Sequence, residues 1–296
     1  MSTKQLHYFL VLAKHCHFTR AAAELHIAQP ALSIAIKNLE QHVGLTLFHR
    51  QGKQLCLTHE GTALLPHAQA VLQQLTDAER AMADLRGVET GEVRLGVPGM
   101  LGSYYFPPIL MGFKQRYPNL KLTLVEAGGS SLKKMLLKGE IDIGVIINED
   151  VPDTLETDHL LYSQMVAVAS QDHPIAQLPS IRFDQFLAEP LVLFKAGYFH
   201  RDYIDAAIQH QHMQPNIAFE TNLLPMILQI VRHQYAITAL IELVTQYEPG
   251  LTAIPFSSPI TLDLALAWRK DSYLSVADRT FIEFIKQSNH FQLHTT

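Results

Sequence analysis

Residues 18–50 read FTRAAAELHIAQPALSIAIKNLEQHVGLTLFHR, and this stretch decides how the N-terminal part of the chain folds. Three consecutive alanines, residues 21–23, favour a short helix and leave no bulk to hold a neighbouring helix away. Thr19 is a suitable N-cap for this helix, which is predicted over residues 20–25. An earlier helix is predicted over residues 5–13, where apolar residues recur at spacings of three and four.

A longer helix is predicted to begin near Gln29, because Pro30 fits a first helical turn, and to end at Gly44. Its buried stripe consists of apolar residues at helical spacing: Leu32, Ile36, Leu39 and Val43. If this stripe faces the core, Gln29, Ser33 and Lys37 form one line on the exposed face. These residue types can contact base edges and phosphates, and two helices joined by a tight turn form a helix-turn-helix. A polar line alone is more often a solvated surface.

The next segment, residues 45–61 (LTLFHRQGKQLCLTHEG), predicts two short apolar strands around a basic turn at residues 50–53. A basic hairpin beside a recognition helix is a wing. With the wing included, residues 18–61 closely resemble the LysR-type transcriptional regulators. The resemblance rests on these positions: Phe18-Thr19, Ala21-Ala22, Leu25, Gln29-Pro30-Ala31-Leu32-Ser33, Ile36-Lys37, Leu39-Glu40, Gly44, Leu47-Phe48, Arg50, Leu57-Thr58 and Gly61.

Two positions depart from the family pattern: Ala28 stands where Ser or Thr is common, and Ile34 stands where Arg is common. We expect the missing helix cap and the missing phosphate-reaching side chain to weaken or redirect DNA contact locally. The resemblance implies that the following residues contact DNA: Thr19, Arg20, Gln29, Pro30, Ser33, Ile34, Lys37, Arg50 and Lys53.

The net charge of −5 hides an uneven distribution along the chain. In residues 1–58, six lysines and arginines face only Glu24 and Glu40, a balance of +4 that leaves −9 for the remainder. Six of the 16 histidines also lie in this segment and can gain charge beside phosphates. A basic N-terminal segment suits a polyanion, although a solvated face would have the same composition.

Residues 58–86 predict one long helix with an apolar seam at alternating steps of four and three. The seam consists of Leu64, Ala68, Val71, Leu75, Ala78, Met82 and Leu85. Such a seam favours pairing with a second chain over packing on its own chain. In LysR-type proteins the corresponding helix is the linker that dimerises the DNA-binding domains, and the family commonly assembles as a tetramer.

Strands and helices alternate after Gly91, which indicates an α/β domain. Strands are predicted over residues 93–97, 120–126, 141–147, 165–170, 191–194, 217–220, 236–240, 251–256 and 260–269. Helices are predicted over residues 106–117, 130–138, 200–210, 222–234 and 275–288. These strands are too many for one small sheet.

The expected fold class is α/β with an N-terminal winged helix-turn-helix, a long linker helix and a regulatory domain. By resemblance, this regulatory domain has two lobes, is similar to periplasmic binding proteins, and has crossovers near Leu160 to Met165 and Ala265 to Lys270. The expected domains are residues 1–58 (DNA-binding), 59–90 (linker and hinge) and 91–296 (effector-binding). Lobe I is expected to hold residues 91–161 and 269–296, and lobe II residues 162–268.

A cleft between two such lobes is where a small ligand is expected, because open α/β sheets bind ligands beyond the carboxyl ends of their strands. By resemblance the effector-binding residues are Gly99, Met100, Ser103, Gly129, Ser130, Ile147, Asn148, Phe199, His200, Thr221 and Asn222. Hydroxyl residues are frequent in the family where Gly99 and Met100 stand, so capture of a carboxylate is in doubt here. Met100, Tyr198 and Phe199 make the expected cleft apolar.

The chain carries no motif that indicates an enzyme. Residues 96–99 (GVPG) lack the dinucleotide-binding pattern, and neither a phosphate-binding loop nor a nucleophile elbow occurs. We therefore expect no catalytic residues and no cofactor. The His-X-His triplets at residues 15–17 and 210–212 have no partner cluster, so no metal site is expected. Cysteine-based peroxide sensing is not expected either, because the regulatory region holds no cysteine.

We expect a cytoplasmic protein without a membrane partner. No stretch approaches the roughly 20 apolar residues of a membrane helix, and the N-terminus lacks the features of an export signal. Two cysteines cannot form a disulfide framework for a chain of 296 residues.

Together these observations predict a ligand-responsive DNA-binding transcriptional regulator. Its expected partners are double-stranded DNA, a small-molecule effector and further copies of itself, with RNA polymerase as an additional candidate. The alternative is a cytoplasmic solute-binding or transferase-like α/β protein with a basic N-terminal module.

Overall fold

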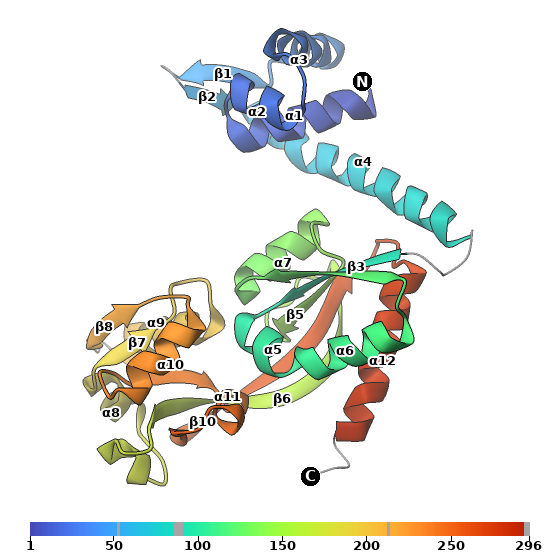
Figure 1. Cartoon of the computed structure of the whole chain (residues 1–296). Helices are drawn as coiled ribbons and strands as arrows, with labels where there is room; N and C mark the ends of the chain where they lie inside the picture. Colours follow the sequence, from blue (N-terminus) through green and yellow to red (C-terminus); the bar gives the residue numbers. More distant parts are fainter. Residues whose placement is uncertain (52–53, 86–90, 212–213, 293–296) are drawn as a thin grey trace. The chain divides into compact units, whose positions relative to one another are not determined.

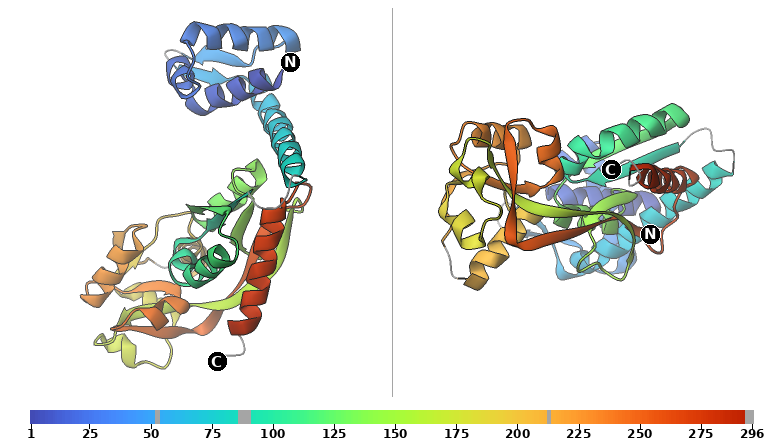
Figure 2. Two further views of the ribbon diagram at one scale, coloured as in Figure 1. Left: turned by 45° about the vertical axis from the view of Figure 1, so that its right-hand side comes forward. Right: turned by 90° about the horizontal axis from the view of Figure 1, so that it is seen from below.

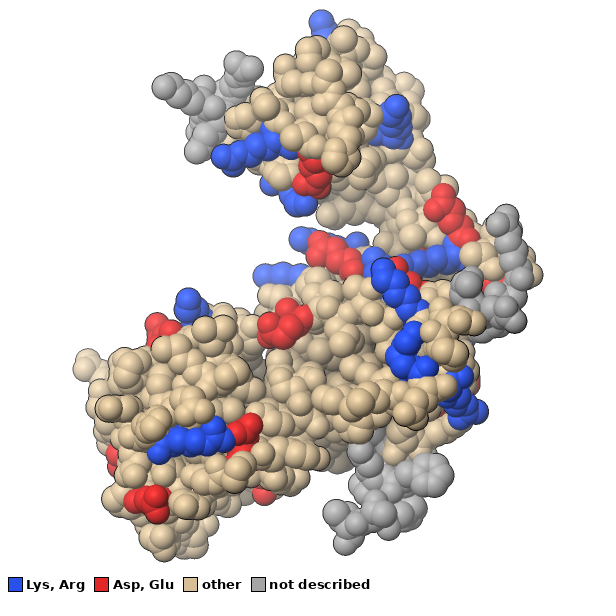
Figure 3. All heavy atoms as spheres, in the orientation of Figure 1, with Lys and Arg blue, Asp and Glu red and all other residues tan. Residues whose placement is uncertain are grey.

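The computed structural model describes residues 1–51, 54–85, 91–211 and 214–292 and forms two compact units, Met1–Arg86 and Gly87–Thr296 (Figure 1). None of the helices in these ranges is both long and apolar enough to cross a bilayer. On the face drawn in Figure 3, charged side chains of both signs are scattered over a mostly uncharged surface. This face therefore shows no single patch of one charge.

The first unit begins with three helices: α1 (Thr3–His15), α2 (Phe18–Glu24) and α3 (Gln29–Val43). The prediction that Thr19 caps the second helix is wrong. The extended N-cap is His17, whose Nδ1 accepts a hydrogen bond from the Arg20 amide at 3.5 Å. An imidazole can supply the same acceptor that a hydroxyl would, so the helix starts earlier and Thr19 lies in its first turn.

Helix α3 buries the predicted apolar stripe, since Leu32, Ile36 and Leu39 are almost completely inaccessible to solvent. Its N-cap, Ala28, makes no side-chain capping hydrogen bond, as the sequence implied. The helix ends at Gly44, where a φ of +71° places the backbone in the left-handed region that glycine adopts without strain.

A two-stranded antiparallel hairpin follows, made of β1 (Phe48–Gln51) and β2 (Gln54–Leu57). Its start is fixed to the recognition helix, because Glu40 Oε1 accepts hydrogen bonds from the amides of Leu47 and Phe48 at 2.8 and 3.2 Å. The recognition helix and the hairpin therefore form one rigid element.

The last helix of the first unit, α4 (His59–Asp84), is capped by Thr58, whose Oγ1 accepts from the Gly61 amide at 2.9 Å. A Cβ at Gly61 would lie only 2.2 Å from the Leu47 carbonyl oxygen, so a glycine is needed where this helix crosses the hairpin. Leu64 and Ala68 pack against the core of the helix-turn-helix.

The second unit contains a six-stranded sheet with the order β4-β3-β5-β10-β6-β9. The strands are β3 (Gly91–Val97), β4 (Leu120–Glu126), β5 (Ile143–Ile147), β6 (Leu155–Ser170), β9 (Thr238–Ile241) and β10 (Leu251–Arg269). Strand β3 pairs in parallel with β4 and β5, whereas β10 pairs antiparallel with both β5 and β6.

Helices cover both faces of the sheet in lobe I: α5 (Gly99–Tyr104), α6 (Phe106–Arg116), α7 (Gly129–Lys138) and α12 (Val276–Gln292). A Cβ at Gly91 would lie 3.1 Å from Ala277 of α12, and one at Gly96 would lie 2.6 Å from Leu132 of α7. Since residues 91 and 96 point to opposite faces of β3, α12 and α7 sandwich the strand between them (Figures 1 and 2).

Lobe II combines the distal halves of β6 and β10 and strand β9 with a small parallel sheet of β7 (Leu191–Leu193) and β8 (Ile217–Glu220). Its helices are η1 (Pro174–Gln177), α8 (Phe183–Ala188), α9 (Phe199–Gln211), α10 (Leu224–Arg232) and α11 (Leu243–Tyr247). The sequence predicted α9 and α10 but missed α5, α8 and α11, which have only five or six residues each.

The two lobes are joined by β6 and β10, which form one long antiparallel pair (Figure 2). At one end of this pair Leu155 lies opposite Arg269, and at the other end Ser170 lies opposite Leu251. The sequence predicted only the second half of β6 and divided β10 into two strands. On β6, residues 165–168 already pair with β9 in lobe II, so the first crossover precedes Met165. The second lies earlier than residues 265–270, because residues 264–267 already pair with β5 in lobe I.

Candidate functional site

The outward face of α3 carries the predicted base-reading residues. Gln29, Ser33 and Lys37 are all exposed, on a line that flanks the buried stripe. Ile34 is 60% exposed and, at 100° per residue, points almost directly away from the core. The face that would meet a DNA groove therefore combines three polar side chains with one large apolar side chain.

Other predicted DNA-contact residues surround this face. Thr19 and Arg20 are exposed in the first turn of α2, and Pro30 is exposed in the first turn of α3. The backbone of Arg50 lies in β1, and Lys53 falls outside the described residues.

One basic residue of the first unit is already paired. Lys14 Nζ lies 3.0 Å from Glu24 Oε1, and His15 also contacts the Glu24 carboxylate. Hydrogen bonds from His15 and then Lys14 hold the pKa of Glu24 below its usual value. Its carboxylate offsets the charge of Lys14, and the net +4 of residues 1–58 already includes this offset.

The apolar seam of α4 divides into two parts. Leu64 and Ala68 pack within their own unit, which fits the alternative that the helix packs on its own chain. Beyond them Val71, Leu75 and Met82 remain exposed, Leu75 at 43%. This second part is available for pairing with another copy of the chain.

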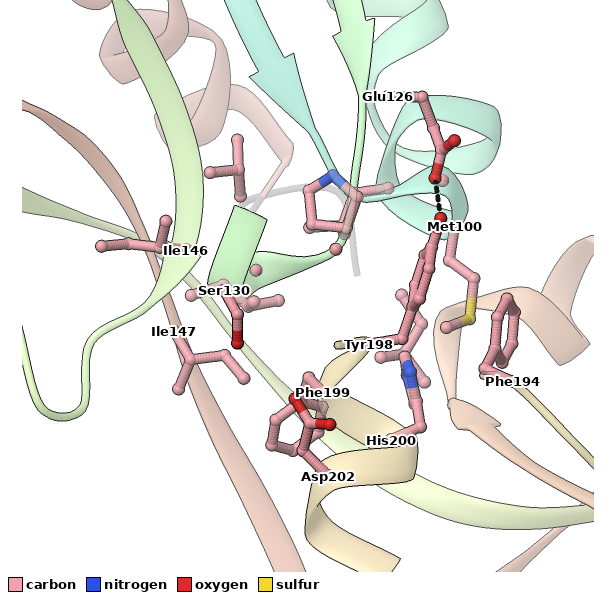
Figure 4. Close-up of a pocket in the computed structure, with 18 of the residues that line it drawn as sticks. Met100, Glu126, Ser130, Ile146, Ile147, Phe194, Tyr198, Phe199, His200 and Asp202 are labelled. Carbon is pink, nitrogen blue, oxygen red and sulfur yellow. Dashed lines mark hydrogen bonds between the residues drawn. The ribbon is translucent and has the colours of Figure 1, made fainter. Parts of the chain in front are cut away.

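A cavity of about 470 Å³ lies between the two lobes of the second unit (Figure 4). This volume falls in the range of pockets that hold small molecules. Nine of the predicted effector-binding residues line it: Gly99, Met100, Ser103, Gly129, Ser130, Ile147, Phe199, His200 and Asn222. They come from the starts of α5, α7 and α9, the end of β5 and the loop before α10.

Two predicted residues do not line the cavity. The amide of Asn148 donates to Asp263 Oδ2 at 2.9 Å and its oxygen accepts from Thr157, so the side chain is held on strands β6 and β10. Thr221 Oγ1 accepts from the Leu223 amide at 3.1 Å and stabilises the turn before α10. The family resemblance implied both positions, and hydrogen bonds direct both side chains elsewhere.

The lobes touch through a hydrogen bond at the cavity. The hydroxyl of Tyr198, just before α9, donates to Glu126 Oε1, at the end of β4, at 3.0 Å (Figure 4). Burial, followed by this contact with Glu126, raises the pKa of Tyr198 to about 12. The hydroxyl therefore keeps its proton, and can donate, throughout the physiological pH range.

The backbones of the two lobes also meet beside this bond. A Cβ at Gly128 would lie 2.1 Å from the carbonyl oxygen of Gly197 and 3.3 Å from the amide nitrogen of Tyr198. Gly197 itself has a φ of +92°. Only glycine allows this approach at residue 128, and glycine is strongly favoured at residue 197.

A second interlobe contact joins α5 to α11. The Tyr104 hydroxyl donates to Glu248 Oε1 at 2.6 Å, while the other oxygen of Glu248 pairs with Arg232. The ring of Tyr104 also stacks on Tyr247, with centroids 5.9 Å apart. Burial, and then the hydrogen bond with Glu248, raises the pKa of Tyr104.

His200 is the most deeply buried polar side chain in the cavity wall, with 7% of its surface exposed. Its ring stacks on Phe194 with centroids 5.6 Å apart. Among the described residues neither ring nitrogen has a hydrogen-bond partner. Burial lowers the pKa of His200 to about 3, so the imidazole is neutral and offers one donor and one acceptor.

Sequence reasoning missed several lining residues, among them Glu126, Phe194 and Asp202. One signal could have found Glu126. It is the last residue of a correctly predicted strand, and ligands bind beyond the carboxyl ends of such strands. Phe194 and Asp202 carried no comparable signal, because their positions depend on how lobe II folds.

Comparison with known proteins agrees with this architecture. Residues 3–62 match the model of the bacterial regulatory helix-turn-helix proteins of the lysR family, and residues 86–289 match the LysR substrate binding domain. The chain is 31% identical to the HTH-type transcriptional regulator YwbI of Bacillus subtilis (strain 168), over 97% of this chain and 96% of that protein. It is 28% identical to the RuBisCO operon transcriptional regulator of Allochromatium vinosum, over 96% and 95% of the two chains.

A solved structure shares the whole architecture. Full-length OxyR from Pseudomonas aeruginosa, solved as a cysteine variant, superposes with a TM-score of 0.69 at 26% identity, over 97% of this chain and 94% of that one. The helix-turn-helix with its wing, the two-lobed unit and these matches lead to one conclusion. The chain belongs to the LysR family and is a ligand-responsive, DNA-binding transcriptional regulator.

Proposed function

We propose that the interlobe cavity is the effector site and that the outward face of α3 reads the operator. The observation that carries the first part is the position of the cavity, beside the Glu126–Tyr198 hydrogen bond and the Gly128–Gly197 contact. A ligand here touches both lobes. It therefore binds one lobe arrangement more tightly than another and shifts the population toward it.

Strands β6 and β10 would convert this shift into a change in the regulatory unit. They are the only described strands that pass from one lobe to the other, so a change in lobe angle must bend or twist this pair. In an oligomer whose subunits touch through both lobes, the same change alters the spacing of the DNA-binding units. The response is then a change in the geometry of DNA contact more than a loss of affinity.

The DNA-reading part rests on α3. Gln29, Ser33 and Lys37 lie on one exposed line and supply the hydrogen-bonding groups suited to base edges and phosphates. We further propose that the exposed part of the α4 seam pairs two chains, so that two recognition helices meet two half-sites. Two such pairs would form a tetramer.

The role is regulatory and not catalytic, since the relatives that match the whole chain are transcriptional regulators. A cytoplasmic location follows from the DNA partner. Neither proposal depends on a metal or a cofactor.

The effector site can be tested without knowing the effector. A metabolite collection is screened by thermal shift with three proteins: the parent, Ser130→Trp and Ser131→Trp. The Trp side chain at residue 130 is intended to fill the cavity. Ser131 is an exposed neighbour on α7 that does not line the cavity. A ligand at 100 times its Kd adds about 2.7 kcal/mol to the native state. Hits that survive in Ser131→Trp but vanish in Ser130→Trp support the cavity, whereas hits that persist in both variants place the effector elsewhere.

A further inference from the structure

The charged side chains that line the interlobe cavity are unbalanced. Four carboxylates contribute to the wall, from Glu126, Glu149, Asp150 and Asp202, but only one ammonium group, from Lys133. The Lys133 ammonium is already engaged, since it donates to the backbone carbonyls of Glu149 and Asp150 at 2.6 and 3.3 Å. Within the described part of the chain, none of the four carboxylates forms an ion pair.

Two of these carboxylates are fixed in place. Glu126 accepts the hydrogen bond from Tyr198, and its Oε1 would lie 3.2 Å from a Cβ at Gly99, so the carboxylate sits at the start of α5. Asp202 Oδ1 accepts from the Gly197 amide at 2.9 Å. In Figure 4 the two carboxylates lie on either side of Tyr198. A ligand beside this ring therefore meets negative charge from both lobes.

Aromatic rings line the same cavity as these charges. Phe194 and Tyr198 stack with centroids 5.3 Å apart, and Phe199 is half-buried in the same wall. The faces of aromatic rings attract organic cations, and carboxylates beside such rings strengthen that attraction. The remaining wall is largely aliphatic, with Met100 and Ile147 among its residues.

His200 adds an unsatisfied hydrogen-bonding group to the wall. Both ring nitrogens are buried and without a partner in the described residues, and the ring is neutral because burial lowers its pKa. Its unprotonated nitrogen can accept a hydrogen bond from an amine, and its N–H can donate to an acceptor, so the preference for a cation rests on the carboxylates and the aromatic rings.

Helix N-termini favour an anion, and four helices begin in the cavity wall: α5, α7, α9 and α10. Each terminus is equivalent to about +0.5 of an elementary charge, roughly +2 together. The lining side chains carry four negative charges and one positive charge, a net −3. The side chains therefore outweigh the helix termini.

We infer that the effector of this protein is an organic ammonium compound with an apolar or aromatic body, and that organic anions are poor ligands. The cation is held by Glu126, Asp202 and the aromatic rings of the cavity wall. This inference rests on the proposal that the effector binds in the interlobe cavity.

The test uses matched probes in place of the unknown effector. A set of small apolar scaffolds is prepared so that each scaffold is present as a primary amine, an alcohol and a carboxylate, for example 4-phenylbutylamine, 4-phenylbutan-1-ol and 4-phenylbutanoate. Binding to the full chain is measured by thermal shift and then by calorimetric titration. The variants are Glu126→Gln and Asp202→Asn, which keep the acceptor oxygens, together with Ser130→Trp and its control Ser131→Trp.

We expect each amine that binds to bind at least about tenfold more tightly than its matched carboxylate, a factor that one or two partly solvated carboxylates can supply. Glu126→Gln and Asp202→Asn should each reduce this ratio, and Ser130→Trp should abolish binding. Tighter binding of the carboxylates by the parent would overturn the inference and leave the effector site standing. If Ser130→Trp and Ser131→Trp behave alike with every scaffold, both the effector site and the inference are wrong.

Discussion

Gly128 and Gly197 approach each other across the two lobes so closely that a Cβ on Gly128 would lie 2.1 Å from the Gly197 carbonyl oxygen. Gly129, the next residue, has open space where its Cβ would be. Two adjacent glycines at the start of α7 therefore differ completely in what they tolerate. The first permits the closed lobe arrangement, and the second is a matched control for it.

Gly128→Ala should force the lobes or the Gly197 backbone to shift, because the clash is with main-chain atoms. We expect a loss of about 1–3 kcal/mol in the free energy of unfolding, together with weaker binding of any cavity ligand. Gly129→Ala should change the free energy of unfolding by less than about 0.5 kcal/mol. Urea denaturation of the two variants provides the comparison, and equal effects would mean that the lobes do not close as described.

Ile34 is expected to contact the methyl group of a thymine, since it is the large apolar side chain on the outward face of α3. The highest-affinity duplex is selected from a random pool, and each thymine is then replaced in turn by deoxyuridine, which removes only the methyl group. At one position per half-site the parent should lose about 0.8 kcal/mol, or roughly fourfold in affinity. The Ile34→Ala variant should bind the thymine and deoxyuridine duplexes with equal affinity at that position. The idea fails if parent and variant respond equally at every thymine.

Gln29 and Arg20 should differ in how they contribute to DNA binding. Gln29→Ala is expected to relax preference at one base pair by roughly 1–3 kcal/mol and to leave binding to random DNA unchanged. Arg20→Ala should weaken binding to all sequences and reduce the slope of log affinity against log salt by about 0.9. Equal losses on specific and random DNA for Gln29→Ala would exclude a base-reading role.

Leu75→Glu should separate paired chains, because the exposed part of the α4 seam would then bury an unpaired charge at the interface. Light scattering after gel filtration should show a smaller assembly, and cooperative operator binding should be lost. Gln74→Glu adds the same charge to an exposed neighbour outside the seam and should leave the mass unchanged. A Leu75→Glu variant that keeps its mass would show that the chains pair elsewhere.

Acidification should destabilise the protein through His200. The pKa of His200 is lowered to about 3 in the folded state from an ordinary value near 6.5, so between these values the unfolded state binds more protons. Stability is therefore expected to fall as the pH drops below 6.5, by at most about 1.4 kcal/mol per pH unit from this group. His200→Phe should flatten this dependence, measured by urea denaturation between pH 4 and 8. The same exchange at the exposed His233 serves as the control and should leave the parent profile unchanged.

The sequence predicted the winged unit well because its determinants are local. The stripe of Leu32, Ile36 and Leu39 and the stop at Gly44 each follow from residues within a few turns of one another. The N-cap differs from the prediction because an imidazole nitrogen accepts the hydrogen bond in place of the usual hydroxyl, and such a cap is not recognisable from sequence alone.

The candidate site was less predictable because its residues come from strands and loops far apart in the chain. Nine of the eleven residues that the family resemblance implied line the cavity. Asn148 lies outside the cavity wall because its side chain bonds to Asp263, 115 residues away, and no local pattern reveals that pairing. Glu126 acquires its role only when Tyr198 arrives from the other lobe.

The pairing of β10 with β5 has a consequence for how the protein is made. Lobe I begins with β3, β4 and β5, but it is completed only by β10 and by α12, whose Phe281 packs on Phe113 with ring centroids 4.9 Å apart. At about 5–20 residues per second, a ribosome needs roughly 7–27 s to travel from the end of β5 to Phe281. Throughout that interval the apolar segment IGVII of β5 has no partner on its second edge. We therefore expect the winged unit to fold first during translation, and the first lobe to remain incomplete until β10 and α12 have been synthesised.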